Sequence, residues 1–216
     1  MMSSDRGDAM PDDAKVRAFV AVELPRDLRE WCADAQERSR RLLGSAASAV
    51  RWVDPEGIHL TLKFLGYVPE ARLPTITNRL QESLAQQSPF PLAVGHLGIF
   101  PNVRSPRVMW LAVLGDQPAL RACQRRVEDA TVPLGFAPEK RPFQPHLTLG
   151  RVRETATSQQ LAAIGSLMAE EQSASSRQFA VTSARLMESR LSPSGARYSQ
   201  LAAFPFEASA TTRYPG

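Results

Sequence analysis

The chain has 216 residues, 43% of them hydrophobic, and its 26 basic and 22 acidic side chains give a formal net charge of +4 at pH 7. This length suits one domain or two small lobes, with enough apolar content for an ordinary core. The modest basic excess permits phosphate binding but equally fits a solvated, arginine-rich surface. Residues 1–14 contain no apolar stretch, and no apolar run approaches the roughly 18 residues of a membrane span. These features argue against secretion and membrane insertion.

Hydrophobic periodicity and turn residues predict strands and helices that alternate along two similar halves. The predicted strands are Ala18–Glu23, Ile58–Leu65, Leu92–Phe100, Val108–Val113, Pro145–Val152, Phe179–Ser189 and Tyr198–Pro205. The predicted helices are Arg26–Leu43, Leu73–Gln86, Pro118–Thr131 and Ser158–Glu170, and a turn is expected at Ser192–Gly195. Residues 15–206 are expected to form one domain, with a disordered segment at 1–14 and a loose tail at 207–216.

The two cysteines, Cys32 and Cys123, both fall in predicted amphipathic helices. No metal-binding or redox spacing surrounds either of them, so buried thiols are expected rather than a disulfide. This use of cysteine favours a cytoplasmic location.

The tetrapeptide His-Leu-Thr-Leu occurs twice, at 59–62 and at 146–149, and uses two of the three histidines. Residue frequencies give this sequence after a given histidine on the order of once in a thousand, so the repetition indicates a functional element. Alternation along a strand places His59 beside Thr61, and His146 beside Thr148, with the leucines facing the core. If the two strands are neighbours, two imidazoles and two hydroxyls meet across a cleft.

An imidazole has an ordinary pKa of about 6.5, so one histidine can donate a proton near neutral pH while another accepts one. Arg151 follows the second motif, and its guanidinium could hold phosphate oxygens through two hydrogen bonds. On a regular strand Arg151 would face away from His146, so the strand must end, twist or bulge near Gly150 for Arg151 to reach the site. This set of side chains points to phosphoryl chemistry.

The chain resembles the 2H phosphoesterases, and among them the RNA 2′,3′-cyclic phosphodiesterases once called 2′-5′ RNA ligases. The resemblance covers roughly residues 16–206. It is carried by four blocks: Arg51-Trp52-Val53 with His59 through Gly66, Phe100-Pro101 with Pro106 through Leu111, Pro145 through Arg151, and Ser189-Arg190-Leu191 with Gly195-Ala196-Arg197-Tyr198.

The resemblance implies an α+β fold with two pseudo-symmetric lobes of antiparallel sheet and flanking helices around a central cleft. It implies no cofactor and no metal, and a ligand that is RNA or a nucleotide with a 2′,3′-cyclic phosphate end. His59 would protonate the leaving ribose oxygen, His146 would activate water, and Thr61 and Thr148 would hold the phosphate. The product would be a 2′-phosphate, and the reverse reaction would join RNA ends. A monomer is expected.

Several alternatives remain open from the residues themselves. The same fold could serve as a nucleotide or RNA sensor with little turnover, although two histidines exceed what binding alone requires. A hydrolytic metal site is disfavoured because His-x-Thr lacks further ligands. Large aromatics such as Trp52, Phe64, Phe100 and Trp110 are more typical of a core, and Phe64 and Phe100 are the preferred candidates for stacking on a base.

The remaining basic candidates have ordinary explanations as well. His96 has no threonine partner and is expected to be structural or at the surface. Arg104 and Arg107 either contact RNA phosphates at the rim of the cleft or are simply solvated.

Overall fold

The computed structural model describes residues 14–170, 176–192 and 195–207, so the predicted terminal segments and the centre of the predicted turn at Ser192–Gly195 lie almost entirely outside the described residues. The strands are β1 (Lys15–Glu23), β2 (Val50–Trp52), β3 (His59–Pro69), β4 (Phe90–Phe100), β5 (Val108–Gly115), β6 (His146–Val152), β7 (Arg177–Val181), β8 (Ser183–Ser192) and β9 (Gly195–Pro205). The helices are α1 (Arg26–Leu43), α2 (Leu73–Leu84), α3 (Gln117–Thr131) and α4 (Ser158–Glu170).

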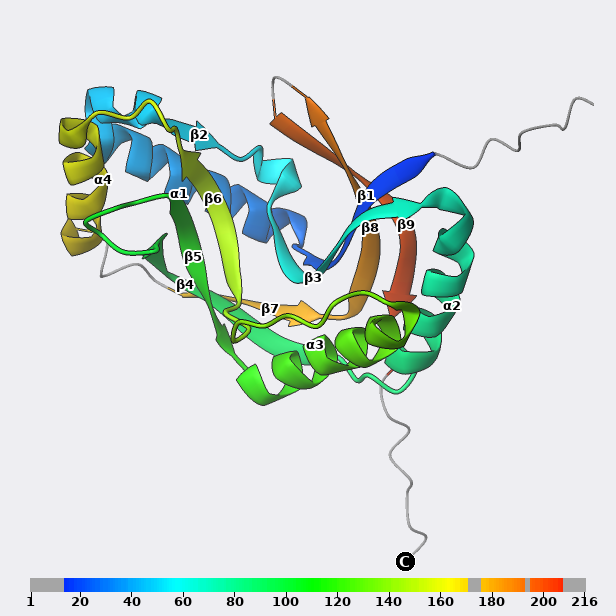
Figure 1. Ribbon diagram of the computed structural model, residues 1–216. Coiled ribbons are helices and arrows are strands. Elements are labelled where there is room, and N and C mark those ends of the chain that lie inside the picture. The colour runs from blue at the N-terminus through cyan, green and yellow to red at the C-terminus, as the bar shows by residue number, and fades with distance from the viewer. Residues whose placement is uncertain (1–13, 171–175, 193–194, 208–216) are drawn as a thin grey trace, which may run out of the picture.

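These strands form one curled antiparallel sheet in the order β7-β4-β5-β6-β3-β1-β8-β9, with β2 added beside β6 (Figure 1). The two strands that carry the motifs, β3 and β6, meet at the centre through the pair Leu60 and Leu147. Each is the innermost strand of its half, with three strands beyond it in the order, and β2 adds a short fifth strand to the half that contains β6. The predicted α+β fold with two lobes is confirmed.

Helices cover the convex side of the sheet in two pairs, α1 with α4 and α2 with α3 (Figure 1). Helix α1 follows β1 along the chain but packs against the half that contains β6. There the Gln36 amide donates hydrogen bonds to the carbonyls of Leu149 (2.8 Å) and Val53 (2.7 Å). One continuous core of buried apolar side chains underlies both halves. Both cysteines lie in this core as free thiols, as predicted, and burial raises the pKa of each to about 12.

One predicted strand is wrong. The run Phe179–Ser189 divides at Thr182 into β7, which pairs with β4, and β8, which pairs with β1 and β9. The two pieces therefore belong to opposite halves of the sheet. A continuous run of strand-forming residues does not reveal that the chain crosses from one half to the other, because that choice depends on partners distant in sequence. The three-residue strand β2 was not predicted either, being too short to show a period.

Candidate active site

The motif side chains lie as the alternation predicted. Each motif histidine and threonine is half-buried on the concave face of the sheet. The four leucines of the two motifs, Leu60, Leu62, Leu147 and Leu149, are at most 3% exposed and belong to the core. Because Leu60 pairs with Leu147 between antiparallel strands, the two histidines and two threonines flank a single contact at the centre of the molecule.

A bulge in β6 brings Arg151 to the same face as His146. Trp110 pairs with Thr148 and Met109 with Gly150, so Leu149 is an extra residue in the ladder. Leu149 and Gly150 are consecutively buried, and Arg151 is then exposed. The predicted break in alternation near Gly150 is confirmed, and it places a guanidinium on the side of the sheet that holds the imidazoles.

Strand β3 contains the same device. Ala21 pairs with Thr61 and Val20 with Lys63, so the ladder shifts by one residue between them. Phe64 consequently lies on the concave face and is 57% exposed. Phe64 and Arg151 therefore occupy equivalent positions, each five residues after the histidine of its motif.

Both imidazoles are oriented by a backbone carbonyl two residues before them. His59 Nδ1 lies 2.8 Å from the Gly57 oxygen, and His146 Nδ1 lies 2.7 Å from the Gln144 oxygen. Since a carbonyl can only accept, each Nδ1 carries the hydrogen. In the neutral ring Nε2 is therefore the basic nitrogen, available to exchange a proton with a ligand.

Each imidazole also lies between two aromatic side chains. The His59 ring centre is 4.7 Å from that of Phe19 and 4.9 Å from that of Tyr198. His146 is surrounded in the same way by Phe100 at 5.1 Å and Trp110 at 6.2 Å. These contacts hold both rings in place and partly exclude water.

The indole of Trp110 lies flat because residue 98 is glycine. A Cβ at Gly98 would lie 2.2 Å from the indole, so no other residue fits without displacing it. Phe100 stacks on the same indole at 4.7 Å.

Two aromatic members of the site, Phe19 and Tyr198, were not predicted from the sequence. Tyr198 lies in one of the blocks that carry the family resemblance, which could have pointed to it. Phe19 gave no signal beyond its place in a predicted strand.

The site lowers the pKa of both histidines. Burial is the largest cause for each, and the hydrogen bond to the backbone carbonyl partly offsets it. The positive charges of His146 and Arg151 lower the pKa of His59 further, and Arg151 acts on His146 in the same way. Because such influence falls with distance, these three groups lie near one another. Burial raises the pKa of Tyr198, against the opposing charges of Arg151 and Arg17.

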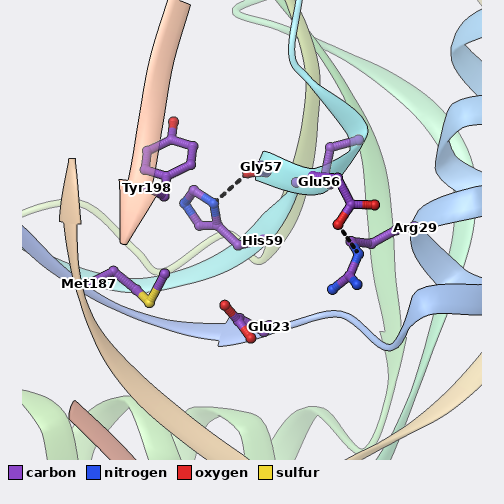
Figure 2. Close-up of a pocket in the computed structure, with 8 residues that line it drawn as sticks. Glu23, Arg29, Glu56, Gly57, His59, Met187 and Tyr198 are labelled. Carbon is purple, nitrogen blue, oxygen red and sulfur yellow. Dashed lines mark hydrogen bonds and ion pairs between the residues drawn. The ribbon is translucent and has the colours of Figure 1, made fainter. Parts of the chain in front are cut away.

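A shallow hollow opens beside His59 (Figure 2). Its lining residues are Glu23, Arg29, Glu56, Gly57, Ile58, His59, Met187 and Tyr198. Its carboxylates are already paired, Glu56 with Arg29 at 3.3 Å and Glu23 with Arg185 at 2.6 Å. In Figure 2 the Tyr198 ring stands against the imidazole with its hydroxyl directed away. The hollow thus supports His59 rather than offering free charges to a ligand.

The other candidates differ in their exposure. The expectation that Phe64 lies in the core is wrong, because its side chain is exposed. Trp52, Phe100 and Trp110 are half-buried. Trp52 lies under the guanidinium of Arg40, 4.7 Å from its ring centre. His96 is exposed, as expected, with its ring 6.4 Å from Trp110. Arg104 and Arg107 are exposed, so their role at the rim stays a prediction.

Within residues 14–170, 176–192 and 195–207, no group of three or more His, Cys, Asp or Glu side chains could hold a metal ion. In the same part of the chain no helix has the length and apolarity needed to cross a membrane.

Fold and site define a two-histidine phosphoesterase of the 2H type, and comparisons with known proteins specify the family. The model of the 2′-5′ RNA ligase superfamily matches residues 18–192, and the chain belongs to this family. The RNA 2′,3′-cyclic phosphodiesterase of Methanothermobacter thermautotrophicus is 37% identical over 190 residues, which cover 88% of this chain and 98% of that protein. The predicted family is confirmed.

Two solved structures share the fold. TT0787 of Thermus thermophilus superposes with a TM-score of 0.71 at 26% identity, covering 89% of this chain and 99% of that one. E. coli LigT, solved in complex with 3′-AMP, gives a TM-score of 0.68 at 24% identity, with the same coverage of both chains.

Proposed function

We propose that this protein hydrolyses the 2′,3′-cyclic phosphate end of RNA, or of a nucleotide, to a 2′-phosphomonoester. The observation that carries the proposal is the paired arrangement of His59 and His146, each with Nδ1 bound to a backbone carbonyl and Nε2 left for proton exchange. The relatives named RNA 2′,3′-cyclic phosphodiesterases support this choice of substrate. The nucleotide complex of LigT supports a nucleotide ligand, although that likeness concerns the fold alone.

In the proposed mechanism, neutral His146 takes a proton from a water molecule as the water oxygen attacks phosphorus. The bond between phosphorus and the ribose 3′ oxygen breaks, and protonated His59 gives its proton to that oxygen. The products are a 3′-hydroxyl and a 2′-phosphate, with the two histidines left in exchanged protonation states. General acid and general base catalysis each contribute typically 10²- to 10⁴-fold in rate.

The phosphoryl oxygens carry negative charge throughout this reaction and need donors that are already in place. Thr61 and Thr148 supply one hydroxyl beside each histidine, and Arg151 supplies a guanidinium on the same face. The bulges of β3 and β6 fix where Phe64 and Arg151 project, so little rearrangement is needed when a ligand binds. Phe64 and Phe100 are the proposed stacking surfaces for the terminal base.

Joining of RNA ends would follow from the same residues. If the 5′-hydroxyl of a second RNA replaces water, His146 takes its proton as the 5′ oxygen attacks phosphorus, the bond to the ribose 3′ oxygen breaks, and His59 gives its proton to that oxygen. A 2′-5′ linkage forms, and no further catalytic group is needed for this step.

The direct test is incubation of the purified protein with a nucleoside 2′,3′-cyclic phosphate in the presence of EDTA. We expect many turnovers and a 2′-phosphate product, identified by ³¹P NMR or by chromatography against both isomers. Saturable binding without turnover would contradict the proposal and favour a nucleotide sensor. A 3′-phosphate product would instead reverse the assignment of the leaving oxygen.

A further inference from the structure

Strand β3 continues beyond the motif with more side chains on the concave face. Its ladder with β1 pairs His59 with Glu23, Thr61 with Ala21, Phe64 with Phe19, and Tyr67 with Arg17. Partners directly opposite each other in an antiparallel ladder point to the same side of the sheet. The four β1 partners lie at alternate positions, and Phe19 and Ala21 lie outside the main core, in the small apolar cluster beneath His59.

Two register shifts produce this row. One falls between the partners Val20 and Ala21, and the other between Ala18 and Phe19. Without them, simple alternation would place Lys63, Leu65 and Tyr67 on the face of His59 and send Phe64 into the core. With them, the spacing of two, three and three residues keeps His59, Thr61, Phe64 and Tyr67 on one face.

The outer part of this row is open to solvent and combines aromatic rings with a positive charge. Phe64 is 57% and Tyr67 is 70% exposed. The Arg17 guanidinium lies 5.8 Å from the centre of the Phe64 ring and donates a hydrogen bond to Ser189 Oγ. Among the described residues, Arg17 has no carboxylate within ion-pair distance, so its charge is not neutralised by the sheet.

We propose that Phe64 and Tyr67 of β3, together with Arg17 on the adjacent strand β1, bind the nucleotides that precede the cyclic phosphate in a single-stranded RNA. These three residues are called the β3 row below. This inference rests on the proposed function, because it extends outward from the same phosphate site. Bases stack on exposed aromatic rings whatever their sequence, and a guanidinium placed between such rings meets the backbone phosphate.

Distances along the sheet favour an oligonucleotide over a mononucleotide. From Glu23, opposite His59, to Arg17, opposite Tyr67, β1 advances six residues, or about 20 Å at about 3.3 Å per residue. A mononucleotide whose phosphate lies between the two imidazoles can reach Phe64 but not Tyr67. Their β1 partners, Phe19 and Arg17, are two residues apart, so Phe64 and Tyr67 are about 7 Å apart along the sheet, above the roughly 3.4 Å of one stacked base step. The row therefore suits bases that are splayed apart in a single strand.

The experiment compares two substrates with the same terminal nucleoside: a nucleoside 2′,3′-cyclic phosphate, and a short unstructured RNA ending in it. For Tyr67→Ala and Arg17→Ala, we expect kcat/KM on the RNA to fall about fivefold or more through KM. On the mononucleotide, both variants should stay within about twofold of the original protein. Arg17→Ala should also reduce the salt dependence of RNA binding by about one unit of slope, whereas Tyr67→Phe, which keeps the ring, should retain activity on the RNA.

Leu42→Ala and Arg79→Ala are the matched controls, since both side chains are 52% exposed on helices away from the row. Neither should change the ratio between the two substrates. If Tyr67→Ala and Arg17→Ala leave the RNA kinetics unchanged, or reduce both substrates equally, the β3 row is not an RNA subsite while the proposed function stands. If the original protein hydrolyses neither substrate, the proposed function itself is wrong and the inference falls with it.

Discussion

The proposed mechanism depends on two imidazoles held in one tautomer. A histidine exposed to water would exchange freely between its two neutral forms, but His59 and His146 each have Nδ1 against a carbonyl. The flanking rings, Phe19 and Tyr198 on one side and Phe100 and Trp110 on the other, limit rotation. Removal of either imidazole should therefore affect the reaction far more than the fold.

We expect His59→Ala and His146→Ala each to lower kcat by at least about 10²-fold, because each deletes a general acid or base. Steady-state assays on a cyclic phosphate measure the loss, and circular dichroism verifies the fold. His96→Ala is the control, since this histidine is exposed on β4, which is separated from β6 by β5, and should keep nearly full activity. Near-normal turnover in either motif variant would remove that residue from the mechanism.

The lowered pKa of both histidines sets the pH dependence of kcat/KM, which reports the free protein. In the proposed mechanism the base, His146, must be neutral, and its lowered pKa keeps it neutral down to a pH below the ordinary value of about 6.5. Acid His59 must be protonated, and its lowered pKa moves loss of the proton to lower pH as well. Both limbs shift in the same direction, so we expect a bell-shaped profile with its maximum below about pH 6.5.

Replacement of Arg151 by Gln provides the check on cause. Its charge lowers the pKa of both histidines, so Arg151→Gln should move both limbs to higher pH while reducing overall activity. A profile that keeps its position, or moves to lower pH, would contradict this electrostatic account.

Among the strands and helices, β3 is anchored immediately beyond its bulge. The side chain of Lys63 at that position is 3% exposed and pairs with Glu128 of α3. Lys63 Nζ also donates to the Ala137 carbonyl at 3.1 Å, in the segment that leads from α3 to β6. A buried cation on the first motif strand thus anchors the segment that carries the chain to the second motif.

Because breaking a buried ion pair leaves one charge unpaired, Lys63→Met should lower the free energy of unfolding by about 3–5 kcal/mol. The double variant Lys63→Met/Glu128→Leu should recover much of that loss, since neither charge then remains. Urea denaturation of the two single variants and the double variant measures the coupling. Additive losses would show that the two side chains do not act as a pair.

Across the molecule, the two halves share one sheet and one core. Leu60 and Leu147, both fully buried, form the central contact between them. Trp31, Trp52 and Trp110 lie on α1, β2 and β5, which belong to the half that contains β6. Tryptophan fluorescence therefore reports on that half, and far-ultraviolet circular dichroism on both.

We expect the two signals to change in a single coincident transition. Leu60→Ala lies in the other half, yet it should lower the tryptophan midpoint, with a loss of about 2–5 kcal/mol. Leu191→Ala, at a position 67% exposed, should leave the midpoint unchanged. Separate transitions would mean that the two halves fold independently. The two histidines would then come together only after the folded halves associate.

The members of the two His-Leu-Thr-Leu motifs, and the faces on which they lie, could be predicted without coordinates. Alternation and helical periodicity depend on near neighbours along the chain, so the faces of the motif strands, the extent of α1 and the core leucines follow from local patterns. The repeated tetrapeptide identified both histidines and both threonines, and the matching blocks predicted the family.

How these parts meet depends on long-range packing. The pairing of β3 with β6, the division of Phe179–Ser189 between the halves, and the contacts of Phe19 and Tyr198 with His59 join segments far apart in sequence. Backbone hydrogen bonds in a ladder do not depend on side-chain identity, so local patterns leave partner and register open. The bulges show this most clearly, because packing of β3 on β1 and β6 on β5 places Phe64 and Arg151 on the concave face of the sheet.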